Sequence, residues 1–261
     1  MIKDQYYYID NINSNLNTRK PTNLGYYNSI YSQIITVGKE KTDFFNLSDA
    51  LNSIKDNNIN NRYLIRISPG IYVDDQIIIL KEYVDIDGHT KDNTIISLTY
   101  DDSTNNDNII NRNIDLFVNS YYVKLSKNSF IKNITFLRPH TPLTIIYNIL
   151  MYYEDEVMTN YSDTAYPRLE NVNIINKGNA ETNVGILLKD FYSTINSPFQ
   201  NIKIDVNNGI LQNMGIIIKN TNTVYNSTYL NNKLPKLFNN LQIDILNNSI
   251  IIPNDRIYNL N

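Results

Sequence analysis

Residues 169–196 read LENVNIINKGNAETNVGILLKDFYSTIN, and residues 199–226 read FQNIKIDVNNGILQNMGIIIKNTNTVYN. The two segments align without a gap at an offset of thirty residues, so that Asn171 falls on Asn201 and Lys189 falls on Lys219. The same unit recurs with looser spacing at IKNITF (131–136) and FNNLQIDI (238–245). A fixed period of this length indicates a stacked architecture, because one unit cannot bury its apolar face without a neighbour.

Each copy carries two short runs of β-branched residues separated by Asn and Gly turns, with no helical period. This pattern predicts an all-β fold, a single-stranded right-handed parallel β-helix in which each copy forms one coil. By the two-residue alternation of a strand, Val172 and Ile174 should point inward while Asn173 faces out. The Asn before each strand should stack on its counterparts about 4.8 Å away and form a structural amide ladder rather than a site. The four residues of this ladder are Asn133, Asn171, Asn201 and Asn240.

The repeat divides the chain into an arm, residues 1–33, and a β-helix domain, residues 34–261, with insertions expected near 138–168 and 223–236. Asn46 is a candidate N-cap, and the apolar residues that follow it have the spacing of one helix face. They are Leu47, Ala50, Leu51 and Ile54. A short helix here would cover the open N-terminal end of the stack.

The N-terminal half of the domain resembles the pectin lyase-like superfamily, and within it the pectinesterase-type β-helices. The resemblance spans about Ile34–Phe136 and is carried by RYLIRISPGIY (62–72), VDIDG (84–88), TII (94–96) and FIKNITF (130–136). It implies a β-helix whose relatives include catalytically silent examples from phage tails and large-virus particles. The pectinesterase segments that supply acid, nucleophile and arginine are not found after Phe136, and the chain has no Trp. The resemblance therefore implies no catalytic residue here.

Two Tyr-rich segments are candidate contact surfaces, because Tyr offers amphipathic contact area. The arm is either flexible or docks on a neighbouring subunit; its candidate docking residues are Tyr6, Tyr7, Tyr8, Tyr26 and Tyr27. The segment 152–167 interrupts the repeat, and solenoid insertions often carry a binding surface. It is either a plain surface loop or a surface for a ligand or partner formed by Tyr152, Tyr153, Glu154, Glu156, Tyr161 and Tyr166.

The sequence offers little for catalysis or cofactor binding. At the offset of thirty residues no carboxylate stacks on another, and Asp85 and Asp87 are interpreted as surface charges. The like pair Lys189 and Lys219 must stay solvated or meet an anion. Both histidines are expected in loops. The Asx-rich loop 101–113, in which Asp101, Asp102 and Asp107 could hold calcium, is interpreted as solvated rather than as a calcium site. We therefore expect no cofactor and no metal.

The composition and charge of the chain exclude several classes of partner and of chemistry. A net charge of −3 without a basic block argues against nucleic acid, and the absence of Cys excludes thiol chemistry and Cys-zinc sites. No run reaches membrane-spanning length, and no secretion signal is expected in this chain. The leading hypothesis is a non-enzymatic structural or adhesive β-helix at the surface of a virion or other particle, or else cytoplasmic, contacting copies of itself or other particle proteins. The alternative is a carbohydrate-active enzyme or glycan-binding protein acting on a polysaccharide.

Overall fold

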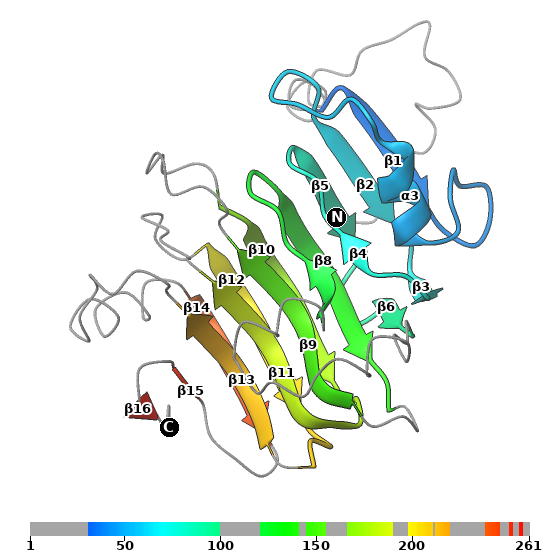
Figure 1. The fold of residues 1–261 in the computed structure, drawn as a ribbon. Helices are drawn as coiled ribbons and strands as arrows, with labels where there is room; N and C mark the ends of the chain where they lie inside the picture. The colour runs from blue at the N-terminus through cyan, green and yellow to red at the C-terminus, as the bar shows by residue number, and fades with distance from the viewer. Residues whose placement is uncertain are drawn as a thin grey trace, which may run out of the picture.

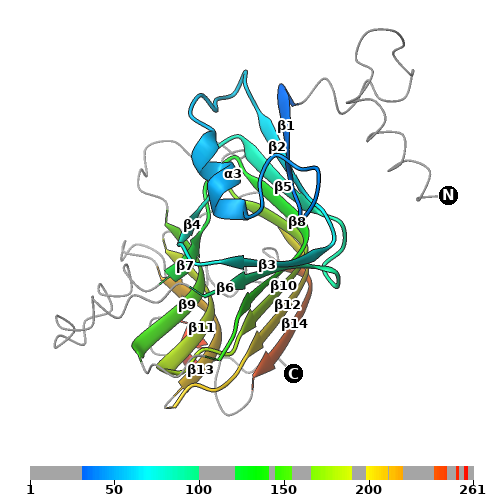
Figure 2. The same ribbon diagram turned by 90° about the vertical axis from the view of Figure 1, so that its right-hand side faces the viewer.

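The computed structural model describes residues 31–99, 121–140, 145–154, 166–189, 198–210, 212–219, 238–245, 251–252 and 256–257. Parallel strands wind through it in two long sheets that face each other (Figures 1 and 2). The first sheet joins β1 (Gln33–Val37), β2 (Tyr63–Ile67), β5 (Val84–Gly88), β8 (Phe130–Arg138), β10 (Arg168–Asn176), β12 (Phe199–Val206) and β14 (Phe238–Ile245). In the same sheet β6 (Thr94–Leu98) also pairs with β8, and β3 (Gly70–Asp74) pairs with β6. The second sheet joins β13 (Gln212–Lys219), β11 (Ala180–Lys189), β9 (Ile145–Glu154), β7 (Tyr121–Lys124) and β4 (Ile78–Ile79). A short antiparallel pair, β15 (Ile251–Ile252) and β16 (Arg256–Ile257), lies outside both.

Successive coils stack in the register that the repeat predicts. β10 and β12 are parallel, with Val172 opposite Ile202 and Asn173 opposite Lys203, which is the offset of thirty residues. Val172 is fully buried in the core, whereas Asn173 on the outward face is only half-buried. The parallel pairing and the alternating burial confirm the all-β parallel β-helix.

The predicted amide ladder is present, but its residues lie inside the strands rather than before them. All four have a left-handed backbone, with φ between 52° and 59°, which Asn tolerates better than most residues. Asn171 donates to Asn133 at 3.1 Å, Asn201 donates to Asn171 at 3.0 Å, and Asn240 donates to Asn201 at 2.8 Å. Each Asn therefore bends its strand at the same point, and the ladder aligns these corners along the stack.

A helix closes the N-terminal end of the core, as predicted. In α3 (Leu47–Ser53), the Asn46 side chain caps the first turn by accepting the N–H of Asp49 at 2.8 Å. The buried Asp74 carboxylate at the end of β3 accepts the N–H of Ser48 at 2.9 Å, which ties the helix to the first coils. α3 and β1 lie at one end of the stack and β14 lies at the other (Figures 1 and 2).

The expected insertion at 138–168 is wrong in its first half, because it contains β9. Every residue from Ile149 to Tyr153 is buried. Leu150 and Met151 belong to the main core, whereas Ile149 and Tyr152 belong to a second apolar cluster with residues of β11 and β13. A strand buried on both faces is apolar throughout and shows no alternation, so the repeat is hidden here. The expected insertion at 223–236 lies outside the described residues.

The interior also holds a second, buried set of asparagines that the sequence did not reveal. Asn148 stacks on Asn183 of the next coil and donates to its side-chain oxygen and to that of Asn176, both at 2.9 Å. Asn176 donates in turn to the backbone carbonyls of Asn148 and Val184 at 2.9 and 2.8 Å. The backbone of Gly178 packs directly on Asn148, leaving no room for a Cβ atom. These hydrogen bonds offset the cost of burying the amides, whereas the side-chain oxygen of Asn148 has no partner among the described residues.

Candidate functional site

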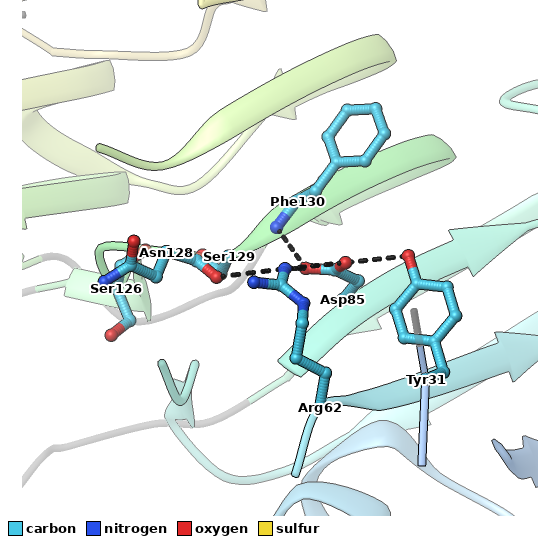
Figure 3. Close-up of polar contacts among 7 residues, drawn as sticks. All are labelled: Tyr31, Arg62, Asp85, Ser126, Asn128, Ser129 and Phe130. Atoms are coloured by element: carbon cyan, nitrogen blue, oxygen red, sulfur yellow. Dashed lines mark hydrogen bonds and ion pairs between the residues drawn. The ribbon is translucent and has the colours of Figure 1, made fainter. Parts of the chain in front are cut away.

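The carboxylate of Asp85 near the start of β5 is the centre of a group of polar contacts that joins several strands (Figure 3). It accepts the hydroxyl of Tyr31 at 2.7 Å, the backbone N–H of Phe130 at 2.9 Å and the Nη2 of Arg62 at 3.0 Å to each oxygen. Arg62 also donates to the backbone carbonyl of Asn128 at 3.4 Å. These contacts join the segment before β1 to β2, β5 and β8.

The interpretation of Asp85 as a surface charge is therefore wrong. The side chain points outward from the sheet, but Tyr31 lies against it, and Asp85 is buried. Burial, together with the negative charge of Asp85, raises the pKa of Tyr31, so the Tyr31 hydroxyl keeps its proton and remains a donor. A buried carboxylate whose oxygens accept this many donors holds neighbouring coils together and is poorly placed to attack a substrate.

Asp87, two residues further along β5, has a similar role. Its carboxylate pairs with Lys132 on β8 at 3.1 Å and accepts the side-chain N–H of Asn133 at 2.9 Å. Asp87 thus supplies the first acceptor of the amide ladder. Its interpretation as a solvated surface charge is also wrong, because both partners lie on the adjacent strand and leave the carboxylate mostly covered.

The predicted ligand surface does not form as an exposed loop where the structure describes it. Tyr152, Tyr153 and Glu154 belong to β9, and Tyr166 lies just before β10; the three tyrosines are buried. Tyr153 and Tyr166 pack edge to face, with their ring centres 6.4 Å apart. These rings are covered because β9 is buried on both faces. Glu156 and Tyr161 lie outside the described residues.

Glu154 instead forms a compact polar group on the second sheet. It accepts the hydroxyl of Tyr152 and pairs with Lys189 of β11, and the Tyr152 ring stacks on Tyr121 at 5.0 Å. Burial opposes ionisation of Glu154, but the contacts with Lys189 and Tyr152 outweigh it and lower the pKa. Lys189 does lie opposite Lys219 in the register of β11 and β13, as the repeat predicts, and the anion that Lys189 meets is Glu154.

The repeat in the sequence did not reveal one pair of stacked carboxylates. Asp205 of β12 lies opposite Asp244 of β14 on the outward face of the first sheet. The expectation that no carboxylate stacks on another is correct for the two copies offset by thirty residues, but β14 follows β12 at an offset of 39. Asp244 is half-exposed and pairs with Lys203 at 3.1 Å, and the Lys203 contact lowers the pKa of Asp244.

The remaining candidates add no chemistry. His89 and His140 lie outside helices and strands, as expected, and His89 contacts the Asn93 side chain at 3.1 Å. Among the described residues, no three His, Cys, Asp or Glu side chains gather where they could hold a metal ion. The Asx-rich loop 101–113 and the candidate docking residues Tyr6, Tyr7, Tyr8, Tyr26 and Tyr27 lie outside the described residues. Within the same part of the chain, no helix has the length and apolarity to cross a membrane.

Comparison with known proteins finds only distant similarity. No protein-family model and no curated protein matches the chain. Pectin methylesterase from carrot is similar at 11% identity and a TM-score of 0.33, over 72% of each chain. Two further pectin methylesterase structures, a mutant with hexasaccharide IV and one with hexasaccharide VII, are similar at 14% and 13% identity, each with a TM-score of 0.33 over 74% of this chain and 67% of theirs. At this level the similarity carries no argument about activity, and the fold rests on the sheets themselves.

Proposed function

We propose that this protein is a non-enzymatic structural or adhesive β-helix that serves as a component of an assembled particle, such as a capsid, tail or fibre. The main support is the use made of its acidic side chains. Asp74, Asp85, Asp87 and Glu154 each accept hydrogen bonds from a neighbouring coil or from the capping helix. Their oxygens accept hydrogen bonds within the stack instead of facing a cleft.

The exposed surface of the β-helix also supports a role in contacts with other proteins. Large apolar side chains are exposed on the lateral surface of the β-helix, at Ile71 and Val73 of β3. Others are exposed near its N-terminal end, at Phe45 and Ile59. Large clusters of exposed apolar side chains are rare on monomeric proteins and often mark sites of association with other proteins. The partners we propose are other copies of the chain and other particle proteins.

A polysaccharide panel tests this function. The purified chain should release no reducing ends, unsaturated products or methanol, and it should be recovered in stoichiometric contact with other copies or other proteins. Turnover of any polysaccharide that is lost on changing a single carboxylate would contradict the proposal.

One observation favours a second candidate, a carbohydrate-active or glycan-binding protein. Strands in a sheet lie about 4.8 Å apart, so Asp205 and Asp244 lie near the separation of the two acids in retaining glycosidases. Asp205→Asn and Asp244→Asn separate the candidates: an enzyme would lose turnover with either change, whereas a structural protein has no turnover to lose. Because Lys203 already pairs with Asp244, we rank this candidate second.

A further inference from the structure

Apolar side chains form a continuous patch on the outward face of the first sheet. We call it the lateral patch; it consists of Ile71, Val73, Ile95, Leu137 and Ile175. Ile71 of β3 lies opposite Ile95 of β6, and Leu137 of β8 lies opposite Ile175 of β10. Because β6 also pairs with β8, the four strands lie side by side in the order β3, β6, β8 and β10. Adjacent strands are about 4.8 Å apart, so the five side chains are neighbours.

The lateral patch is exposed although its side chains are apolar. Ile71 and Val73 are 58% and 62% exposed, and the other three residues are half-buried. Tyr72, which lies between the first two and points inward, is only 3% exposed. The patch ends where Ile175 lies opposite Asp205, because the outward face becomes charged there. A contiguous apolar surface of this kind often marks a contact site.

The first described residue, Tyr31, lies on the outward side of the same sheet (Figure 3). Its hydroxyl donates to Asp85 at 2.7 Å, and Asp85 also accepts the N–H of Phe130 at the start of β8. Leu137 is seven residues further along β8 than Phe130, which at about 3.3 Å per residue is at most about 23 Å. The 30 residues that precede Tyr31 can extend to about 100 Å, so they can reach every part of the lateral patch.

We propose that residues 1–30 of the arm dock on the lateral patch of their own chain. The most aromatic stretch of the arm is Tyr6, Tyr7 and Tyr8, followed by Ile9. A Tyr side chain combines an apolar ring with a hydroxyl, so it suits a surface that meets both apolar side chains and water. The occupant is the chain's own arm because a tethered segment has an effective concentration of about 1 mM, which exceeds that of any free partner in dilute solution.

Docking of the arm regulates the surface that the proposed function assigns to other proteins. In the free chain the arm shields Ile71 and Val73, so that a particle protein must displace the arm before it contacts them. The shielding therefore limits association through this face before a partner is present. This consequence rests on the proposed function, whereas the docking itself does not.

Cysteine labelling of the full chain tests the docking, because the chain has no cysteine of its own. Ile71→Cys reports on the lateral patch. Ile79→Cys is the matched control, since Ile79 is 54% exposed and lies in β4 of the second sheet. The rate of reaction with a maleimide is divided by the rate for the same variant in urea, which removes differences in intrinsic reactivity. If the tethered arm binds with a dissociation constant of about 0.1 mM, labelling of Ile71→Cys should be about tenfold slower than that of Ile79→Cys.

Changes in the arm then identify what protects the patch. Replacing Tyr6, Tyr7 and Tyr8 together with Ser should make the two cysteines react equally, whereas replacing three polar residues of the arm, Asn11, Asn13 and Asn15, with Ser should leave the difference unchanged.

Three results would overturn the proposal. The first is equal labelling of the two cysteines when the arm is unchanged. The second is protection that survives the loss of the three tyrosines. The third is protection that grows with protein concentration, because the arm would then dock on another copy. The labelling uses neither a particle nor a polysaccharide, so its failure would leave the proposed function to its own test.

Discussion

Replacing one residue of the amide ladder separates its two physical roles. Asn171 donates to Asn133 and accepts from Asn201, and its φ is 53°. Asn171→Ala removes two hydrogen bonds worth about 1 kcal/mol each. It also places a Cβ-bearing residue without a polar side chain in the left-handed region, which costs about 1 kcal/mol more. We expect the free energy of unfolding to fall by about 3 kcal/mol.

Asn171→Gly loses the same hydrogen bonds but tolerates the backbone angle, so its loss should be smaller, about 2 kcal/mol. The matched control is Asn173→Ala on the same strand, where the side-chain oxygen is buried without a hydrogen-bond partner. Removing that oxygen should change stability by less than about 0.5 kcal/mol or increase it. Urea unfolding followed by circular dichroism measures all three variants. Equal losses for Asn171→Ala and Asn173→Ala would refute the structural role of the ladder.

Three further changes probe other contacts. Gly178→Ala would place its Cβ 1.7 Å from the Nδ2 of Asn148. Displacing that buried amide should lower the free energy of unfolding in urea by at least about 2 kcal/mol. An unchanged free energy would contradict the buried network. Tyr31→Phe removes a donor to the buried Asp85 and should cost about 1–2 kcal/mol, whereas an unchanged urea midpoint would show that the contact contributes nothing. Burial raises the pKa of Asp74, so the folded state binds its proton more tightly than the unfolded state does. The stability that Asp74 contributes is therefore complete below its ordinary pKa of 3.8 and is lost as pH rises through the raised value. Asp74→Asn should make the free energy of unfolding depend less on pH across this range. An unchanged dependence would assign it to another group.

The fold could be predicted because its dominant signal is local and periodic. The apolar alternation around Val172, the corner asparagines and the cap at Asn46 each reflect a physical requirement that repeats or is satisfied within a few residues. The same reasoning failed for β9, because a strand buried on both faces has no alternation to detect. The buried Asn148 could not be distinguished from the many asparagines of the turns.

The candidate site was harder to predict because its contacts are long-range. Asp85 is buried by Tyr31, which lies 54 residues earlier in the chain, and no spacing rule links the two. The Asp205 and Asp244 pair was missed because the intervening segment lengthens the last repeat to 39 residues. The outward direction of Asp85 followed from strand alternation, but whether another segment covers it depends on the whole fold.

Engineered disulfides test the stacking of the coils most directly, because the chain has no cysteine of its own. Glu170 and Gln200 are opposite each other in the predicted and observed register. With Glu170→Cys and Gln200→Cys together, mild oxidation should give a disulfide in nearly all of the folded protein, since adjacent strands place the two Cα atoms within the required range. Glu170→Cys with Lys203→Cys, shifted by three residues or about 10 Å, should stay reduced. Efficient bonding of the shifted pair, with none in the matched pair, would contradict the parallel β-helix.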